Sequence, residues 1–412
     1  MSAAPLAGLR VLDLSKVLAG PLCAQFLGDM GADVIKVEPP GAGDETRHWP
    51  PFHRDVAGRE VGTVFLSANR NKRSVVIDLR QAAGQAVLHR LAAVADVVIE
   101  SFGPGVAARL GAGAAALCAL NPRLVHCSIS GYGSAGPMRG GKGYDVILQA
   151  FTGMLSITGE RGGAPVRSPF SPVDQATGLH ALIGILAKLS ERERTGAGGT
   201  VEAALFDTAT SFLGYFLQGY WERGTEPEKP GSGHESLCPY EAFDTADQPL
   251  ILGVANDHLW RLFCRVAGLE AACGNAQFST NAARVQNRGA TVTLVRAALK
   301  QRPRDQWIEL LGAAGIPCSP LHTLGELSAH PHALASGMLT QFHDVQLGTL
   351  RSVAQPLRFD GERTMIRHAP PLAGSSSRDI LAAAGYTPQQ IQEMAAAGII
   401  GVAGHESQAD SG

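Results

Sequence analysis

The stretch from Arg10 to Glu38 constrains the fold most, because its pattern predicts a strand, a helix and a second strand in direct succession. Residues 10–14 are rich in Val and Leu, which suits a strand buried on both faces of a parallel sheet. A helix is expected next, followed by the turn Gly31-Ala32-Asp33 and a strand at 34–38. Strand–helix–strand units of this kind build doubly wound sheets.

The same alternation continues along the chain, with further strands expected at 74–79, 96–100, 124–130 and 201–205. We therefore predict an α/β protein with a large, doubly wound, Rossmann-like domain built on a parallel sheet. After a polar, Gly- and Pro-containing stretch at 224–235, the pattern predicts a smaller α/β domain, then extended structure at 341–359 and a helix at 377–397. Because 412 residues exceed one simple core, we expect two domains. Their predicted bounds are 1–225 for the large domain, 226–330 for the small domain and 331–412 for a return to the large domain.

The composition excludes several classes of partner. The chain has 35 Lys and Arg against 37 Asp and Glu, so no basic excess points to nucleic acid or to an anionic membrane. The seven cysteines form no Cys-x-x-Cys pair, and no His, Cys and carboxylate cluster has ligand spacing, so neither disulfides nor a bound metal is expected. No glycine fingerprint points to a nicotinamide or a flavin. With no leader-like N-terminus and no stretch that could span a membrane, we expect a cytoplasmic protein.

One predicted helix carries a candidate catalytic residue. Apolar residues recur at helical spacing from Leu179 to Leu189, and Pro172 suits the first turn of the helix. Asp174 then falls among the unpaired N–H groups at the positive end of the helix dipole, which is expected to keep its carboxylate ionised. Gly178 and Gly184 would let another segment approach this helix closely. The alternative is that Asp174 is only a capping residue.

Several loops carry candidate binding residues. Residues 17–21 precede a helix, and a helix N-terminus can hold a phosphate or a carboxylate. Asn71, Lys72 and Arg73 form a basic run before a predicted strand, and Phe102 lies in a glycine-rich turn after another strand, where open sheets bind ligands. Arg47, His48 and Trp49 stand together in a loop rich in Pro and Gly, which indicates either a binding loop or an ordinary solvated loop. Ordinary turn chemistry is likewise the alternative for the other loops.

An ordered set of short motifs runs through nearly the whole chain. The set comprises 14–21, 31–38, 43–47, 71–74, 100–105, 131–133, 143–145, Asp174, 194–198, Pro239-Tyr240 and Asn256-Asp257. No single motif is specific, but their combination resembles the class III CoA-transferases of the CaiB–BaiF or formyl-CoA transferase type. The resemblance implies that coenzyme A and acyl-CoA are substrates and that the active protein is an interlocked homodimer.

In that family the matching Asp is the nucleophile, so the resemblance assigns this role to Asp174. The carboxylate would attack an acyl-CoA thioester, giving a mixed anhydride and then an aspartyl-CoA thioester. The resemblance places CoA along nine residues: Val17, Leu18, Ala19, Asn71, Lys72, Arg73, Phe102, Arg109 and Lys142. Gly231-Ser232-Gly233 is the nearest counterpart of a closing glycine-rich loop in some members.

The substrate side is less well matched to the family. This chain has Leu18, Pro39 and Ser101 where formyl-CoA transferases look to have Gln, Arg and Asn. The change at Leu18 removes a polar contact of the active site, which argues against an enzyme specific for oxalate. We assign Arg47, His48, Trp49 and Tyr144 to substrate binding. A basic group there would grip a second carboxylate, so we expect a succinyl-CoA-type donor and a dicarboxylic or hydroxy acid as acceptor.

Two alternatives stay open at this point. The same family includes 2-methylacyl-CoA racemases, which resemble this chain but have His where it has Tyr144, and a phenol of pKa about 10 is a poor base. Neither His126, expected in a buried strand, nor His180, on the Asp174 helix, is expected to replace it. The other alternative is a CoA-binding protein without turnover, which would have no need of a nucleophile at position 174.

Overall fold

A computed structural model of the protein describes residues 4–402. Within that range the chain forms two compact units, one from 4–152, 168–214 and 334–402, and the other from 153–167 and 215–333. The chain therefore leaves the first unit twice and returns to it near its end. Residues 153–167 and 215–225, which the sequence assigned to the large domain, lie in the second unit.

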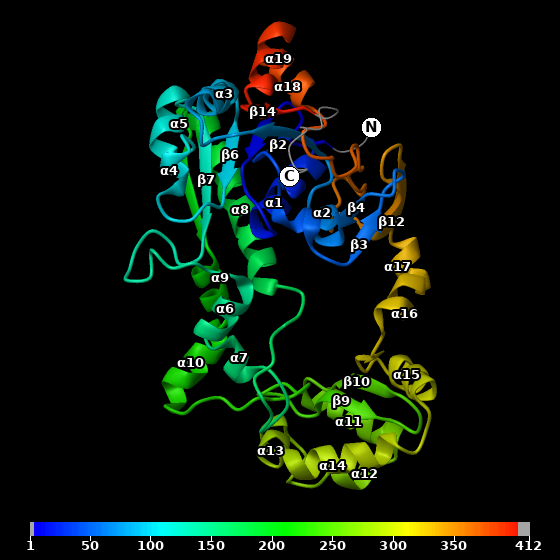
Figure 1. Ribbon diagram of the computed structural model, residues 1–412. Helices are drawn as coiled ribbons and strands as arrows, with labels where there is room; N and C mark the ends of the chain where they lie inside the picture. The colour runs from blue at the N-terminus through cyan, green and yellow to red at the C-terminus, as the bar shows by residue number, and fades with distance from the viewer. Residues whose placement is uncertain (1–3, 403–412) are drawn as a thin grey trace, which may run out of the picture. The chain divides into compact units, whose positions relative to one another are not determined.

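The first unit is built on a seven-stranded sheet with the order β14-β5-β2-β1-β6-β7-β8 (Figure 1). Six strands run parallel as predicted, and β14 pairs with β5 in the antiparallel direction at one edge. The order reverses between β1 and β6, which makes this point the topological switch of the sheet. The strands are β1 (Arg10–Asp13), β2 (Asp33–Glu38), β5 (Lys72–Ile77), β6 (Val97–Glu100), β7 (Val125–Ser130), β8 (Gly199–Ala204) and β14 (Ile400–Gly401).

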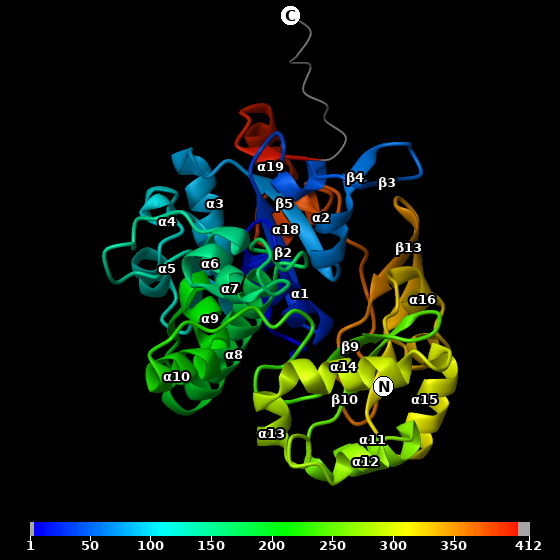
Figure 2. The same ribbon diagram turned by 90° about the horizontal axis from the view of Figure 1, so that it is seen from below.

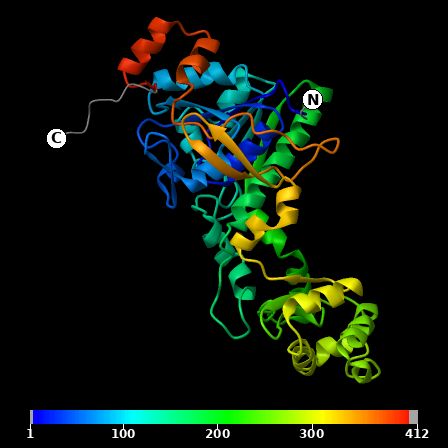
Figure 3. The ribbon, with the colours of Figure 1, turned by 90° about the vertical axis from the view of Figure 1, so that its right-hand side faces the viewer.

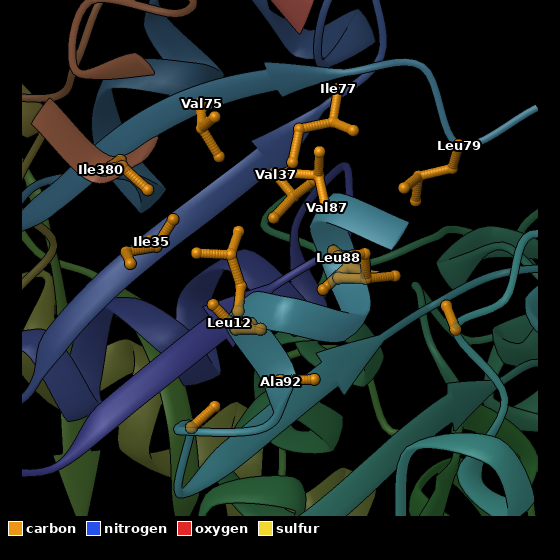
Figure 4. Close-up of a cluster of buried hydrophobic side chains, with 14 of the residues drawn as sticks. Leu12, Ile35, Val37, Val75, Ile77, Leu79, Val87, Leu88, Ala92 and Ile380 are labelled. Carbon is orange, nitrogen blue, oxygen red and sulfur yellow. The ribbon is translucent and has the colours of Figure 1, made fainter. Parts of the chain in front are cut away.

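Helices cover both faces of this sheet. On one face, α1 (Ala19–Asp29) packs against α8 (Pro172–Thr195). On the other face, α3 (Ala82–Ala92), α5 (Ala114–Leu120), α18 (Ser377–Ala383) and α19 (Pro388–Ala396) share a buried cluster with the strands. Figure 4 shows Leu12, Ile35 and Val75 of the sheet pointing toward this cluster. Two helices replace the single one predicted at 377–397, because the chain turns at Gly385, whose φ is +84°.

Shorter elements surround the sheet. Two antiparallel hairpins belong to the first unit, and Figure 3 shows them in blue and in orange. The orange hairpin corresponds to the extended segment predicted at 341–359. The blue hairpin was not predicted from the sequence. The elements are β3 (Phe52–Arg54), β4 (Glu60–Gly62), β12 (Leu339–Asp344), β13 (Gly348–Val353), α2 (Thr63–Ala68), α4 (Val106–Arg109), α6 (Asp145–Phe151), α9 (Leu205–Phe212) and the 3₁₀ helix η1 (Glu45–His48).

The second unit is a smaller α/β fold, as predicted, with the antiparallel strand order β11-β10-β9. Figure 2 labels β9 and β10 together with the helices α11 to α16 of this unit. Its core includes Trp260, Phe263 and Trp307, packed against Leu250 and Leu252 of the sheet. The strands are β9 (Tyr240–Asp244), β10 (Pro249–Gly253) and β11 (Cys318–Pro320). The helices are α7 (Met154–Ile157), α11 (Asp257–Ala267), α12 (Glu270–Cys273), α13 (Asn281–Gln286), α14 (Arg288–Leu299), α15 (Arg304–Ala313) and α16 (Leu324–Ala329), with α10 (Gly214–Arg223) and α17 (Pro331–Ala335) at the boundaries. From residue 4 to residue 402, none of the helices is long and apolar enough to cross a membrane.

Candidate active site

A pocket of about 260 Å³ opens at the carboxyl ends of β1, β6 and β7, where the strand order reverses. This is the position at which open α/β sheets bind ligands. Its walls come from 16–20 after β1, 101–104 after β6, 129–132 at the end of β7, and the glycine-rich segment 139–144. Among the sequence candidates, seven line the pocket together: Val17, Leu18, Ala19, Phe102, Lys142, Tyr144 and Asp174. The whole pocket belongs to the first unit.

Asp174 lies in the first turn of α8, and a second carboxylate caps that turn. Asp145 Oδ2 accepts hydrogen bonds from the backbone N–H groups of Val173 at 2.8 Å and of Asp174 at 3.2 Å. Asp145 is held in turn by the side chain of Gln149, which is also buried. The donors that would have stabilised a negative charge on Asp174 are therefore already used by Asp145.

The pKa of Asp174 reflects this arrangement. Burial, together with the negative charge of Asp145, raises the pKa of Asp174 to about 7. The expectation that the helix end keeps Asp174 ionised is therefore wrong, because burial disfavours the charge and another carboxylate, Asp145, caps the helix end. Near neutral pH, Asp174 exists both as the carboxylic acid and as the nucleophilic carboxylate.

The glycines of α8 allow the close approach that the sequence predicted. A Cβ on Gly178 would lie 2.5 Å from the carbonyl oxygen of Ala19, and a Cβ on Gly184 would lie 2.5 Å from a methyl group of Val201. The clash at position 178 is with backbone, so this position requires glycine, whereas a Cβ at position 184 would force the Val201 side chain to move. The first contact sets the start of α8 directly against the loop that lines the pocket.

The basic run at 71–73 does not reach the pocket. Strand β5 begins at Lys72, so these residues lie at its amino-terminal end rather than in a turn before it. The Lys72 side chain is fully buried and pairs with Asp13 at 2.8 Å. Asn71 donates to Asp29 at 2.7 Å, and Arg73 pairs with Asp33 at 2.7 Å. The expectation that these three residues hold CoA phosphates is therefore not supported by their positions.

Arg47 is also removed from the role that the sequence assigned to it. Its guanidinium is buried, pairs with Glu38 at 2.7 Å and lies 3.7 Å over the centre of the Phe65 ring. Burial alone would raise the pKa of Glu38, but hydrogen bonds and charge from Arg47 outweigh burial and lower this pKa to about 2. A substrate carboxylate cannot reach a guanidinium so engaged.

Other substrate and CoA candidates lie outside the pocket wall. His48 contacts the carbonyl oxygen of Ala42 through Nε2 at 2.9 Å, and Trp49 is partly exposed beside it. Arg109 ends the short helix α4 and is exposed. Of the four residues assigned to the substrate side, only Tyr144 lines the pocket, with an exposed side chain.

The structure adds pocket residues that the sequence analysis did not select. The pocket that contains Asp174 is also lined by Arg139, Lys16 and Glu45. Lys16 and Glu45 form an ion pair at 2.7 Å. In the part of the chain that the structure describes, neither Arg139 nor Lys142 has an ion-pair partner. The glycines that follow Arg139 could have indicated that Arg139 lies in a binding loop. Asp145, in contrast, caps a helix that begins far along the chain, and no local sequence pattern reveals that contact.

No histidine among residues 4–402 lines the pocket. His126 is buried in β7 with its Nε2 2.9 Å from the carbonyl oxygen of Ala112, and His180 contacts the hydroxyl of Thr208 at 3.0 Å. An imidazole base of the racemase type is therefore absent from the described pocket. The same residues contain no group of three or more His, Cys, Asp or Glu side chains that would hold a metal ion.

A doubly wound sheet with a carboxylate in a pocket over its switch point has a candidate catalytic group where open α/β sheets bind their ligands. The sequence profile of CoA-transferase family III matches residues 6–377, and this chain belongs to that family of enzymes. Succinyl-CoA:glutarate CoA-transferase from Mus musculus is 35% identical over 96% of this chain and 90% of its own length. Succinate–glutarate CoA-transferase from Agrobacterium fabrum is 36% identical over 92% of this chain and 95% of its own length.

A solved structure extends the similarity to three dimensions. A CaiB/BaiF family protein from Brucella suis superposes with a TM-score of 0.82 at 35% identity, covering 93% of this chain and all of that one. The predicted family and the predicted class of enzyme, a class III CoA-transferase, are confirmed.

Proposed function

We propose that this enzyme moves CoA from an acyl-CoA donor to a carboxylic acid through covalent intermediates on Asp174. The observation that carries the proposal is the position of Asp174 in the pocket at the switch point, where it has no ion-pair partner in the described part of the chain. A partly buried carboxylate without a counter-ion is a stronger nucleophile than a solvated one. A protein that only bound CoA would gain nothing from such a group.

The reaction divides into steps that each conserve atoms and charge. The Asp174 carboxylate attacks the thioester carbonyl of the donor, which gives a mixed anhydride and releases the CoA thiolate. The thiolate attacks the aspartyl carbonyl, which forms an aspartyl-CoA thioester and releases the donor acid. The acceptor carboxylate attacks this thioester, and the thiolate so released attacks the acceptor's acyl carbon, which restores the Asp174 carboxylate.

For CoA itself, we propose the pocket wall made by Val17, Leu18, Ala19, Phe102 and Lys142. The ammonium of Lys142 would pair with a phosphate, and the Phe102 ring would contact the apolar part of the ligand. Asn71, Lys72 and Arg73 are left out of this set because acids outside the pocket engage their side chains, and Arg109 is left out because it does not line the pocket.

We further propose a succinyl-CoA-type donor and a dicarboxylic acceptor. Relatives named for succinyl-CoA, succinate and glutarate support a dicarboxylate. Because Arg47 is engaged by Glu38, the cation that would hold the second carboxylate is Arg139. A kinetic comparison of glutarate with pentanoate tests this proposal: R139Q should raise KM for glutarate about tenfold and leave pentanoate unaffected. Turnover of monocarboxylates alone would dispose of the dicarboxylate assignment.

We also propose that the active form is a homodimer and that it works in the cytoplasm. The family resemblance supports an interlocked dimer, and the first unit exposes a set of large apolar side chains that a partner would cover. These are Ile147, Phe151, Leu179, Ile183 and Phe212. The seven free cysteines suit a compartment that keeps thiols reduced. Sedimentation of the purified protein as a monomer would contradict the dimer.

The catalytic proposal is tested by D174A and D174N with succinyl-CoA and glutarate. Both variants should bind CoA with the wild-type dissociation constant and lose CoA exchange by a factor of about 10³ or more. The matched control is D207N, which alters an aspartate outside the pocket wall. Exchange that persisted in D174A would show that Asp174 is not the nucleophile.

A further inference from the structure

The loop between β1 and α1, together with the first residues of α1, supplies the pocket wall from Lys16 to Gly20 and has an unusual backbone. Val17 has a φ of +70°, in the left-handed region. A branched side chain is strained at that angle, and the conformation persists only where the surroundings hold it. Something outside the loop must therefore keep Val17 in this conformation.

Two buried lysines hold the backbone on either side of Val17, one at the start of the loop and the other in the first turn of α1. Lys36 Nζ, from β2, donates to the carbonyl oxygen of Ser15 at 3.0 Å. Lys72 Nζ, from β5, donates to the carbonyl oxygen of Pro21 at 2.8 Å. Both lysines are only 1% exposed, so neither can bind a ligand directly. Val17 lies between the two anchored carbonyl groups.

Buried acids fix the two lysines in turn. Asp13 Oδ2 lies 2.8 Å from Lys72 Nζ and 4.0 Å from Lys36 Nζ, and Asp44 lies 2.9 Å from Lys36 Nζ. Two positive and two negative charges therefore balance in the interior, which a buried cluster needs in order to stay charged. Asn69 Oδ1 accepts another bond from Lys72 at 2.8 Å.

The cluster also reaches a second part of the pocket wall. Asp44 caps η1 by accepting a bond from the Thr46 N–H at 3.0 Å. The first residue of η1, Glu45, pairs with Lys16 of the loop at 2.7 Å. Lys36 thus connects to the loop directly through Ser15 and indirectly through Asp44 and Glu45.

We propose that Lys36 and Lys72 are positioning residues, which act through the backbone of residues 15–21 to hold this loop in the shape that accepts CoA. The proposal rests on the proposed function of the pocket as the CoA site. A buried ion pair by itself is weak evidence for stability. Here both ammonium groups donate to backbone carbonyl groups on either side of Val17, the strained residue of the pocket wall. Their role is therefore to hold the backbone around Val17 in its conformation.

The test compares K72M with R70M in the full-length enzyme. Arg70 is a matched control, because it too is buried and pairs with an acid, Asp29 at 2.6 Å, but its side chain contacts Ser352 and Val353 rather than the loop. K72M should raise the dissociation constant of CoA, measured by calorimetry, and KM for succinyl-CoA at least tenfold, with kcat within threefold. R70M should leave both constants within twofold. Equal effects of the two variants would overturn the proposal.

A second pair of variants keeps the proposal testable if K72M does not fold. K36M releases the start of the loop and should also raise the dissociation constant of CoA, whereas K36R keeps a donor and should recover most of the affinity. If K36M leaves CoA binding unchanged, the proposal is wrong.

L18D separates this proposal from the proposed function. If L18D has no effect on CoA binding, the pocket is not the CoA site, and both proposals fail. If L18D weakens CoA binding but K72M and K36M do not, only the positioning role fails.

Discussion

The first unit contains two groups of charged residues that look alike in sequence and differ in structure. Arg47 and Lys72 are buried, and each pairs with an acid within 2.8 Å. Asp174, Arg139 and Lys142 line the pocket, and the described part of the chain offers none of them an ion-pair partner. The partner therefore decides whether a charge stabilises the fold or remains available for chemistry. Each prediction below tests this difference.

The largest expected effect is on the interior group. R47M would leave the Glu38 carboxylate buried without its counter-ion, so the free energy of unfolding should fall by about 3–5 kcal/mol. R139M should change it by no more than about 0.5 kcal/mol, because Arg139 is exposed and unpaired. Urea unfolding of both variants measures the difference. Similar losses in the two variants would remove the distinction between the groups.

In the pocket group, removing the charge of Asp174 should raise the free energy of unfolding instead of lowering it. The folded protein raises the pKa of Asp174 to about 7, whereas its pKa in the unfolded chain is about 4. The stability that the protonated Asp174 side chain contributes is therefore present below the unfolded pKa and is lost as pH rises through 7. At pH 8.5 an ionised Asp174 therefore destabilises the fold. D174N should gain about 2 kcal/mol at pH 8.5 and much less at pH 5. A loss of stability at pH 8.5 would show that Asp174 has a structural role.

A smaller effect, on KM, is expected from substitution of Lys142 in the glycine-rich segment. K142M should raise KM for succinyl-CoA about tenfold, the loss of one charge-assisted contact with a phosphate. R73M is the comparison, because Arg73 pairs with Asp33 at the amino-terminal end of β5, away from the pocket. The KM of this variant for succinyl-CoA should stay within about twofold of the wild-type value. Steady-state kinetics measures both. A larger change in R73M than in K142M would return the phosphate site to the basic run.

The smallest effect concerns the pH dependence. In the wild-type enzyme, kcat/KM should rise with pH through an apparent pKa near 7, as Asp174 loses its proton. D145N removes the neighbouring negative charge but keeps an oxygen to cap α8, so this inflection should move about one unit toward acid. An unmoved inflection would mean that burial alone sets the pKa of Asp174.

Local patterns were enough to predict much of this fold. β1 and β6 are short, buried strands rich in Val, Leu and Ile, and Pro172 with the apolar stripe after it identified α8. Both patterns concern residues close together in the chain. The turn that holds Phe102 was expected at the carboxyl end of a strand, where open sheets bind ligands, and Phe102 does line the pocket.

The errors arose where distant residues pair. Lys72 and Arg73 were predicted to bind CoA phosphates because the acids that neutralise them, Asp13 and Asp33, lie 59 and 40 residues away. The cap on α8 comes from Asp145, 28 residues before Val173. No local pattern contains such contacts, so the sequence could not show that Arg47 and Lys72 are interior residues or that the pKa of Asp174 is raised.

The most direct test of the account is mass spectrometry of the enzyme after incubation with succinyl-CoA and trapping with hydroxylamine. The account predicts a hydroxamate on Asp174 in the wild-type enzyme, and none at that position in D174A, because hydroxylamine intercepts the anhydride or the thioester. Absence of any adduct under turnover, together with deuterium exchange at the α-carbon of a 2-methylacyl-CoA, would contradict covalent transfer and favour a racemase.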